Sequence, residues 1–200
     1  MKSLLQASER ITNVIVVDNG STDGTRLAAA RAGAVVVTAD SVGKGQAIAV
    51  GIDFVTTDHV LLCDGDLTPF PVSSVDRLTD PSAGDKMIIG YPEFTQNTPW
   101  AEPGSLWMFL SGVRSLPTRI VASLVNQGFL RGYAVEVMIN RYAMQNGIKA
   151  EPFPLLSVYG KVKWGREREQ AMRNDFEWLK SIDFDNLNLK EGTTENERTR

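Results

Sequence analysis

Short apolar runs alternate with amphipathic segments over the first third of the chain. Continuously apolar stretches predict strands at 14–17, 34–38 and 60–63, and each run ends in polar residues. Runs of this kind are typical of strands buried on both faces of a parallel sheet. Between them, residues 26–32 and 43–55 are predicted to be helical, the second with apolar positions along one face. This alternation predicts an α/β fold with parallel strands joined by right-handed crossovers.

The rest of the chain mixes apolar patterns with prolines and glycines that interrupt them. The predicted elements are a helix end at 1–10, a short helix at 72–78, a strand at 86–91, an extended segment at 106–114, a helix opened by Pro117, a helix at 133–145, an edge strand at 148–156 and an amphipathic helix at 166–182.

Two segments are predicted to lack regular structure. Residues 95–105 contain two prolines and one glycine, a composition that favours a long, mobile loop serving as a lid over a site. Residues 183–200 are polar and predicted to form a disordered tail. The chain is therefore predicted to form one domain, residues 1–182, followed by this tail.

A pair of carboxylates follows the apolar run at 60–63. Asp64 and Asp66 are two residues apart, so an extended backbone directs both side chains the same way, and Gly65 between them leaves room for a ligand. In open parallel sheets, ligands bind outside the carboxyl ends of the strands. Two hard oxygen donors there suit Mg²⁺ or Mn²⁺ accompanied by substrate phosphates. The alternative is a solvated turn that ends a strand.

Composition excludes several classes of protein. The chain has 200 residues, 42% hydrophobic and 22% charged, enough for one core, and a net charge of −3 that gives no basic footprint for nucleic acid. Its single cysteine, Cys63, permits no intramolecular disulfide and fits a reducing cytoplasm. No apolar stretch is long enough to span a membrane.

Three phrases in order resemble a known family. They are Val-Val-Asp-Asn-Gly-Ser-Thr-Asp-Gly-Thr at 16–25, Gly-Lys-Gly-Gln-Ala at 43–47 and Leu-Leu-Cys-Asp-Gly-Asp at 61–66. Together they resemble the family-2 glycosyltransferases, whose GT-A fold is a Rossmann-like, mostly parallel sheet flanked by helices. Ser-Gly-Val-Arg at 111–114 and Gly-Tyr-Ala-Val-Glu at 132–136 are similar to later motifs of the polyprenyl- or dolichol-phosphate sugar synthases. Glucosyl-phosphoglycerate synthases carry a similar later phrase.

The resemblance assigns roles at the nucleotide end of the site. Asp66 would hold the metal and take part in catalysis, and Asp64 would contact the ribose or share the metal. Asp18 and Asn19 match the pair near the nucleobase, where the family often has a second aspartate in place of Asn19. An amide still donates and accepts hydrogen bonds, so base recognition changes without being lost. The other interpretation of Asp18 is a residue of the turn into a helix.

Three more residues complete the expected site. Lys44 would contact a phosphate, or else it is a solvated lysine before a helix. Arg114 would grip a donor or acceptor phosphate through a bidentate contact, or else it forms a surface ion pair. We expect Glu136 to be the carboxylate near the acceptor, although the helix dipole explains a glutamate in the first turn of a helix equally well.

The implied activity is metal-dependent transfer of a sugar from a nucleotide-diphospho-sugar to an acceptor, either a lipid phosphate such as a polyprenyl phosphate or a small molecule. An anionic phosphate acceptor needs no strong base, and no obvious base other than Glu136 is present. The expected setting is the cytoplasm, with peripheral contact at the inner face of the membrane. Three alternatives remain: a catalytically inactive nucleotide-binding or scaffolding homologue, a glucosyl-phosphoglycerate synthase-like transferase, and a nucleotidyltransferase.

One departure from the family concerns the sheet. Members open with a strand that ends in a phrase like Ile-Pro-x-x-Asn-Glu and lies in the middle of the sheet, whereas this sequence starts within the helix that follows. The strands at 14–17 and 60–63 would flank the missing strand, leaving a gap of roughly 9.6 Å. We expect unpaired backbone groups at this gap to make the chain marginally stable, prone to aggregate, or dependent on a borrowed strand. A second departure is Tyr91-Pro92, where the lipid-phosphate branch often has an arginine.

Overall fold

The structure is a computed structural model of the 200-residue chain. It describes residue 4 and residues 9–40, 43–65, 67–68, 70, 72–92, 109–156, 159–160, 166–183 and 189. The predicted lid at 95–105 and the carboxylate of Asp66 lie outside these residues.

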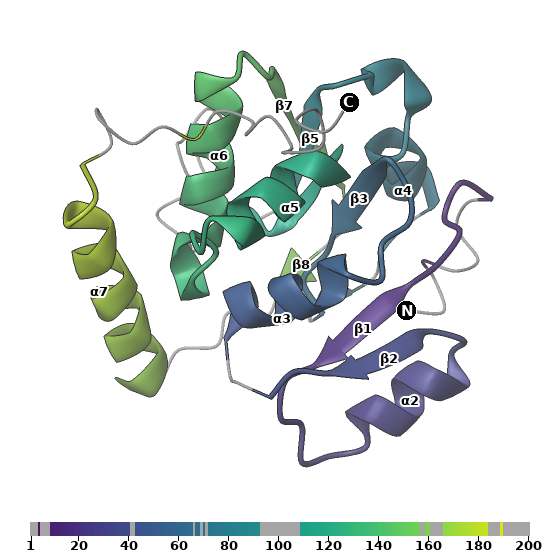
Figure 1. The fold of residues 1–200 in the computed structure, drawn as a ribbon. Helices are drawn as coiled ribbons and strands as arrows, with labels where there is room; N and C mark the ends of the chain where they lie inside the picture. Colours follow the sequence, from purple (N-terminus) through teal and green to yellow (C-terminus); the bar gives the residue numbers. More distant parts are fainter. Residues whose placement is uncertain are drawn as a thin grey trace, which may run out of the picture.

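The amino-terminal part forms a small parallel sheet with helices packed on it (Figure 1). Strands β1 and β2 pair in parallel with Ile15 opposite Val35, and α2 is the crossover between them. Helix α3 follows β2 and packs against β1. The elements are β1 (Ile15–Asp18), α2 (Thr25–Arg31), β2 (Val35–Thr38) and α3 (Lys44–Ile52). All four lie within a few residues of their predicted positions.

A separate four-stranded sheet has the order β3-β6-β5-β7. Strand β6 is antiparallel to both of its neighbours, and β5 is parallel to β7, which lies at the edge as predicted. A short antiparallel pair, β4 with β8, stands apart from it. The strands are β3 (His59–Leu62), β4 (Leu67–Thr68), β5 (Met87–Pro92), β6 (Val113–Pro117), β7 (Ala150–Leu155) and β8 (Tyr159–Gly160). The α/β class is confirmed, although pairing in this sheet is mixed.

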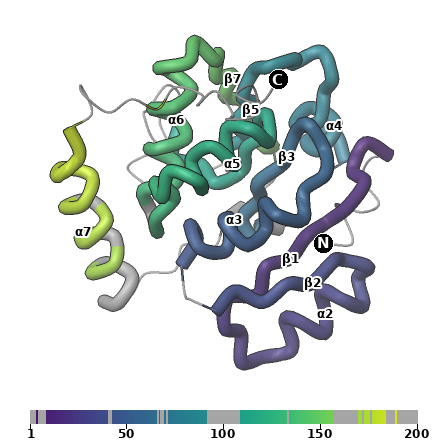
Figure 2. Tube along the Cα trace, viewed as in Figure 1, coloured from purple at the N-terminus to yellow at the C-terminus, as the bar shows by residue number. Residues whose placement is uncertain are grey.

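Helices cover this sheet on both faces, and Figure 2 traces the same arrangement along the chain. On one face α5 and α6 pack against β5 and β6 to form the main core, and α7 packs at the turn that leads into α6. On the other face α4 packs against β5. The helices are α4 (Val72–Leu78), α5 (Thr118–Asn126), α6 (Val135–Gln145) and α7 (Arg166–Lys180). Within these described residues, no helix is long and apolar enough to cross a membrane.

Alternating side chains of β5 connect the two sides of the core. Met87 and Ile89 belong to the cluster under α5 and α6, while Ile88 belongs to the cluster under α4. Successive residues of a strand point to opposite faces, so both clusters grow from one strand. Leu189, within the segment predicted as a disordered tail, is buried in the main cluster; the tail residues around it lie outside the described set.

The two sheets are not joined by strand pairing. Among the described residues β1 pairs with β2 alone, and β3 pairs with β6 alone. Both strands line one cleft of about 1130 Å³. The predicted gap between these strands is therefore present, and their apolar residues are only half-buried, whereas every residue of β6 is buried.

Candidate functional site

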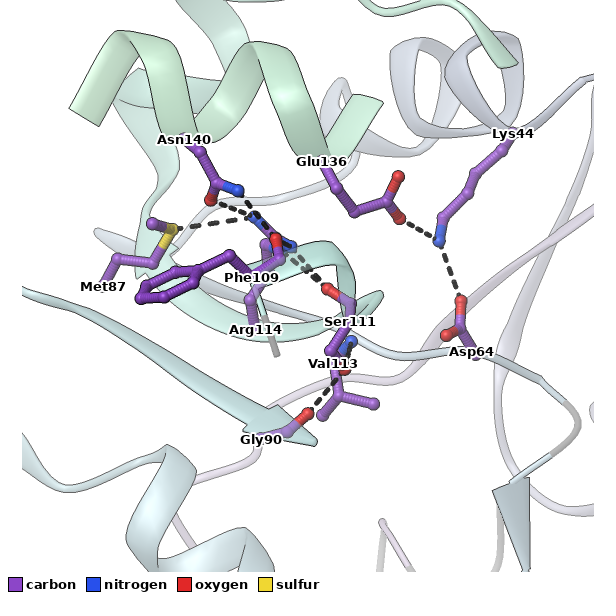
Figure 3. Close-up of polar contacts among 10 residues, drawn as sticks. All are labelled: Lys44, Asp64, Met87, Gly90, Phe109, Ser111, Val113, Arg114, Glu136 and Asn140. Carbon is purple, nitrogen blue, oxygen red and sulfur yellow. Dashed lines mark hydrogen bonds and ion pairs between the residues drawn. The ribbon is translucent and has the colours of Figure 1, made fainter. Parts of the chain in front are cut away.

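Three charged side chains meet where β3 ends and two helices begin (Figure 3). Lys44 is the first residue of α3, and Asp64 lies two residues beyond β3. Glu136 is in the first turn of α6. Helix N-termini carry partial positive charge and free backbone N–H groups, so this junction favours anionic groups. The fold thus gathers residues that lie 20 and 92 positions from Lys44 in the sequence.

Lys44 bridges the two carboxylates. Its Nζ donates to Asp64 Oδ1 at 2.9 Å and to Glu136 Oε1 at 2.5 Å. Glu136 is nearly buried, with 8% of its side chain exposed, while Asp64 exposes 36% of its side chain. Burial by itself lowers the pKa of Lys44, but attraction by Glu136 and Asp64 outweighs it and raises that pKa. Lys44 therefore carries a firmly held positive charge, and the interpretation of a solvated lysine is wrong.

The position of this ion pair depends on a glycine. A Cβ built on Gly112 would collide with the Asp64 carboxylate and the Lys44 ammonium group. Both charged groups can occupy this position only because residue 112 has no side chain.

Arg114 lies behind the ion pair and is fully buried. Its Nη2 donates to the carbonyl oxygens of Phe109, at 3.1 Å, and of Ser111, and its Nη1 donates to Asn140 Oδ1 at 3.0 Å. Asn140 in turn donates from Nδ2 to the Phe109 oxygen at 2.6 Å. Arg114 thus fastens the turn before β6 to α6, and the alternative of a surface ion pair is wrong.

Burial is the main influence on the charge of Arg114. It lowers the pKa of the guanidinium to about 10, although Glu136 and Asp64 both act in the opposite direction. The positive charge of Arg114 is thus kept near the two carboxylates without a direct ion pair to either, since the guanidinium donates to carbonyl, amide and thioether groups.

The end of β1 contributes a second polar group of residues. Asp18 is buried, with 3% exposed, and its Oδ2 lies 3.6 Å from Nε of Arg26. Asn19 donates from Nδ2 to the Gly43 carbonyl at 3.0 Å, which ties this turn to the residue preceding α3. Among the described residues, Asp18 Oδ1 and Asn19 Oδ1 are buried acceptors with no hydrogen-bond partner. Buried polar atoms are rarely left unpaired, so these two oxygens are candidate acceptors for a donor that the described residues do not supply.

The structure brings together most of the residues predicted from the sequence. Lys44, Asp64 and Glu136 are in direct contact, while Asp18 and Asn19 form the neighbouring group. Two further residues were not predicted individually: Asn140 and Gly112. Asn140 lies one helical turn beyond Glu136, so the i, i+4 spacing on α6 was a usable signal.

The donors present fit a divalent cation. The described residues contain no cluster of three or more histidine, cysteine, aspartate or glutamate side chains placed to bind a metal. Mg²⁺ and Mn²⁺, however, are usually held by one or two carboxylates together with substrate phosphates. Asp64 offers one partly exposed carboxylate, of which Oδ1 accepts a hydrogen bond from Lys44.

Comparisons with known proteins find sequence similarity to glycosyltransferases over about half of the chain. A model of the family described as glycosyl transferase family 2 matches residues 1–96. A curated relative, glycosyltransferase AglJ of Haloferax volcanii, is 42% identical over 84 residues, which are 41% of this chain. The chain spans 27% of the length of that relative.

Solved structures resemble the fold over a longer range. Glucosyl-3-phosphoglycerate synthase from Mycobacterium tuberculosis, in complex with Mn²⁺ and uridine-diphosphate-glucose, matches with a TM-score of 0.71 at 20% identity. The match covers 89% of this chain and 72% of that one. A second structure of the synthase, holding Mn²⁺, uridine diphosphate and phosphoglyceric acid, matches with a TM-score of 0.69 at 21% identity, with the same coverage. The fold of this chain is therefore that of the GT-A glycosyltransferases.

Proposed function

We propose that this chain, which belongs to glycosyl transferase family 2 through residues 1–96, transfers a sugar from a nucleotide-diphospho-sugar to a phosphate-bearing acceptor with the help of a divalent cation. The observation that carries this proposal is the Lys44–Asp64–Glu136 cluster at the end of β3. It combines a carboxylate able to hold a cation with a cationic group able to meet a phosphate.

The diphosphate belongs beside Asp64 and Lys44. Asp64, together with Asp66, would hold Mg²⁺ or Mn²⁺, and the cation would neutralise charge on the departing nucleotide. Lys44 would add a hydrogen-bond donor to the same oxygens. Arg114 fits a supporting role, because its hydrogen bonds hold the turn that carries Gly112, against which Asp64 and Lys44 pack.

The nucleobase belongs beside Asp18 and Asn19. Both residues present an unpaired, buried acceptor oxygen, and the edge of a base can supply N–H donors to such atoms. A base bound there would satisfy two groups that otherwise cost free energy, about 1–3 kcal/mol for each unsatisfied buried group.

The state of Glu136 supports an anionic acceptor. A general base must be free to accept a proton, but Glu136 Oε1 is already bound to the Lys44 ammonium at 2.5 Å. A phosphate acceptor is nucleophilic without a base. We infer that Glu136 orients Lys44, and that the acceptor is a phosphate monoester. The synthase of similar fold was crystallised with phosphoglyceric acid and with glycerol 3-phosphate, which carry both a phosphate monoester and free hydroxyl groups. A polyprenyl phosphate shares the phosphate monoester with these molecules but has no free hydroxyl group.

The test measures nucleotide-sugar binding through the change in melting temperature, once with Mn²⁺ and once with a chelator. We expect UDP- or GDP-sugars to raise the melting temperature only with metal, and Asp64→Asn or Asp66→Ala to abolish the shift while leaving the fold intact. Asp53→Asn, an exposed carboxylate at the end of α3, is the matched control and should bind as the parent does. Equal nucleotide affinity in Asp66→Ala and parent, with and without metal, would rule out the metal-site assignment.

A second candidate follows from the divided sheet. With β1 and β3 unpaired to each other, the two halves of the nucleotide site sit on different sheets. The chain would then be a nucleotide-binding homologue without catalysis. Turnover assays on phosphoglycerate and on a short-chain polyprenyl phosphate decide between the two: binding without product formation favours the inactive homologue.

A further inference from the structure

The ammonium group of Lys44 occupies the position of a small cation between two carboxylates (Figure 3). Its Nζ lies 2.9 Å from Asp64 Oδ1 and 2.5 Å from Glu136 Oε1. The three side chains come from three parts of the fold: the start of α3, the segment after β3 and the first turn of α6. Lys44 therefore neutralises negative charge that a divalent cation would otherwise neutralise.

The charges of this cluster balance one another without a metal ion. Among the described residues, the carboxylates of Asp64 and Glu136 act on two positive groups, the Lys44 ammonium and the Arg114 guanidinium. A divalent cation added to the cluster is repelled by both of these groups, because all three carry like charge. Removal of the Lys44 charge would leave a net negative charge and make the cluster attractive to a cation.

The inner side of the cluster has no room for a cation beside Lys44. A Cβ on Gly112 would collide with both carboxylate oxygens of Asp64 and with Lys44 Nζ, so these atoms are packed against the backbone of residue 112. On the solvent side, Asp64 exposes 36% of its side chain and Lys44 exposes 35%. A cation that coordinates Asp64 must therefore arrive from solvent and compete with Nζ for the carboxylate.

The two ion pairs of Lys44 differ in how easily they break. Glu136 exposes only 8% of its side chain, so water and salt screen its pair with Lys44 very little. The pair with Asp64 is longer and more exposed, and exposed pairs contribute little free energy. Lys44 can therefore release Asp64 while it stays bound to Glu136.

We propose that Lys44 is a place-holding cation: it neutralises Asp64 in the ligand-free protein, releases Asp64 to a divalent cation, and then turns its ammonium group to the diphosphate that accompanies this cation. The proposal rests on the proposed function, because it takes Asp64 as a ligand of the cation. The flexible four-carbon stem of a lysine permits such a movement of the charge.

The exchange couples the cation to the diphosphate. A cation alone must displace Lys44 from Asp64 and leave the ammonium group with one carboxylate partner. A diphosphate that binds together with the cation offers the displaced ammonium group new oxygen acceptors. Each ligand therefore strengthens the binding of the other, and by linkage the factor is the same in both directions.

The first test measures Mn²⁺ binding without nucleotide, through the electron paramagnetic resonance signal of free Mn²⁺. Lys44→Met should bind Mn²⁺ roughly fivefold or more tightly than the parent does, because Asp64 has lost its competitor. Lys44→Arg keeps the positive charge and should bind Mn²⁺ no more tightly than the parent. Lys86→Met is the matched control: Lys86 forms a separate ion pair with Glu151, at 2.6 Å, and its loss should leave Mn²⁺ affinity unchanged.

The second test measures nucleoside diphosphate binding by isothermal titration at saturating Mn²⁺, with UDP and with GDP. Lys44→Met should bind the nucleotide that the parent prefers roughly fivefold or more weakly, because the ammonium group that meets the diphosphate is gone. The substitution thus changes the two affinities in opposite directions. A merely structural role of Lys44 would weaken the binding of both ligands.

Equal Mn²⁺ affinity in folded Lys44→Met and parent would overturn the exchange and leave the proposed transferase function standing. Absence of Mn²⁺ binding in both proteins would overturn the exchange together with the metal site of the proposed function. If Lys44→Met does not fold, ¹⁵N NMR follows the lysine ammonium groups of the parent during titration with Mg²⁺, and the Lys44 signal is assigned by its absence from Lys44→Arg. The Lys44 signal should shift while that of Lys86 stays in place. An unmoved Lys44 signal at saturating Mg²⁺ contradicts the proposal.

Discussion

At the scale of single residues, the space at Gly112 governs the candidate site. Gly112→Ala places a methyl group against the Asp64 carboxylate and the Lys44 ammonium, so one of them must move. We expect a loss of about 1–3 kcal/mol in nucleotide-sugar binding, as for other overpacked sites. Isothermal titration measures this loss. Gly24→Ala is the control, because a Cβ on Gly24 meets no atom within 4 Å. Equal binding by both variants would show that the ion pair tolerates displacement.

A substitution of Arg114 distinguishes a structural role of this residue from direct contact with a phosphate. Arg114→Met leaves the Phe109 and Ser111 carbonyls without their buried donor, which should lower the free energy of unfolding by on the order of 2–5 kcal/mol. Urea denaturation measures this loss. Arg119→Met is the control, since its ion pair with Asp85 is largely exposed and should contribute less than about 1 kcal/mol.

The opposite outcome is equally informative for Arg114. If Arg114→Met kept the stability of the parent but lost nucleotide-sugar binding, the guanidinium would be a phosphate ligand, as the family resemblance suggests.

At the scale of elements, the close approach of α3 to the segment before α6 fixes the position of Lys44. Gly45 follows Lys44, and a Cβ there would collide with the Leu130 carbonyl and lie 2.8 Å from Arg131 N. Gly45→Ala should therefore destabilise the protein by about 1–3 kcal/mol, even though alanine favours helix by up to ~1 kcal/mol.

Gly51→Ala in the same helix is the matched comparison. Its Cβ would meet a side-chain methyl, Val17 Cγ2, at 3.0 Å. A methyl group can shift more easily than backbone, so the gain in helix propensity offsets much of the crowding and stability should change by less than about 1 kcal/mol. Urea denaturation of both variants is the measurement. If Gly45→Ala were as well tolerated as Gly51→Ala, the tight contact between α3 and residues 130–131 would be refuted.

The elements also show what the sequence can and cannot predict. The first two strands, α3 and α4 followed from apolar runs and periodicity, which are local signals. Strand β6 was expected to lie at 106–114 but spans Val113–Pro117, because all five of its residues are buried between two neighbours that are distant in sequence. Its antiparallel direction depends on the same non-local pairing.

The candidate site shows the same division between local signals, which the sequence contains, and non-local contacts, which it does not. The ends of β1, α3 and β3 can be predicted from the sequence. Asp18 ends β1, Lys44 begins α3 and Asp64 follows β3. The burial of Arg114 could not be predicted from the sequence, because its partners include two main-chain carbonyls whose positions depend on the turn at 109–111. Likewise, the pairing of Lys44 with Glu136 joins α3 to α6 across 92 residues.

At the scale of the whole molecule, the divided sheet predicts unequal stability in its two parts. Strands β1 and β2 bond to each other but, among the described residues, to no strand of the larger sheet, and most of their residues are half-buried or exposed. Helix α3 packs against both β1 and α5, so side-chain packing rather than backbone hydrogen bonding joins the two parts. Local units with few buried contacts open at lower free energy than the core.

We therefore predict that residues 15–38 open before the β3-β6-β5-β7 sheet does. Native-state hydrogen exchange should give β1 and β2 amides a lower opening free energy than those of β5 and β6, and increasing urea should leave that difference visible until global unfolding. Amides of β5 provide the internal control, since Met87, Ile88 and Ile89 are fully buried. A single opening free energy shared by β1 and β5 would mean that packing through α3 couples the two sheets as strongly as a continuous hydrogen-bonded ladder would.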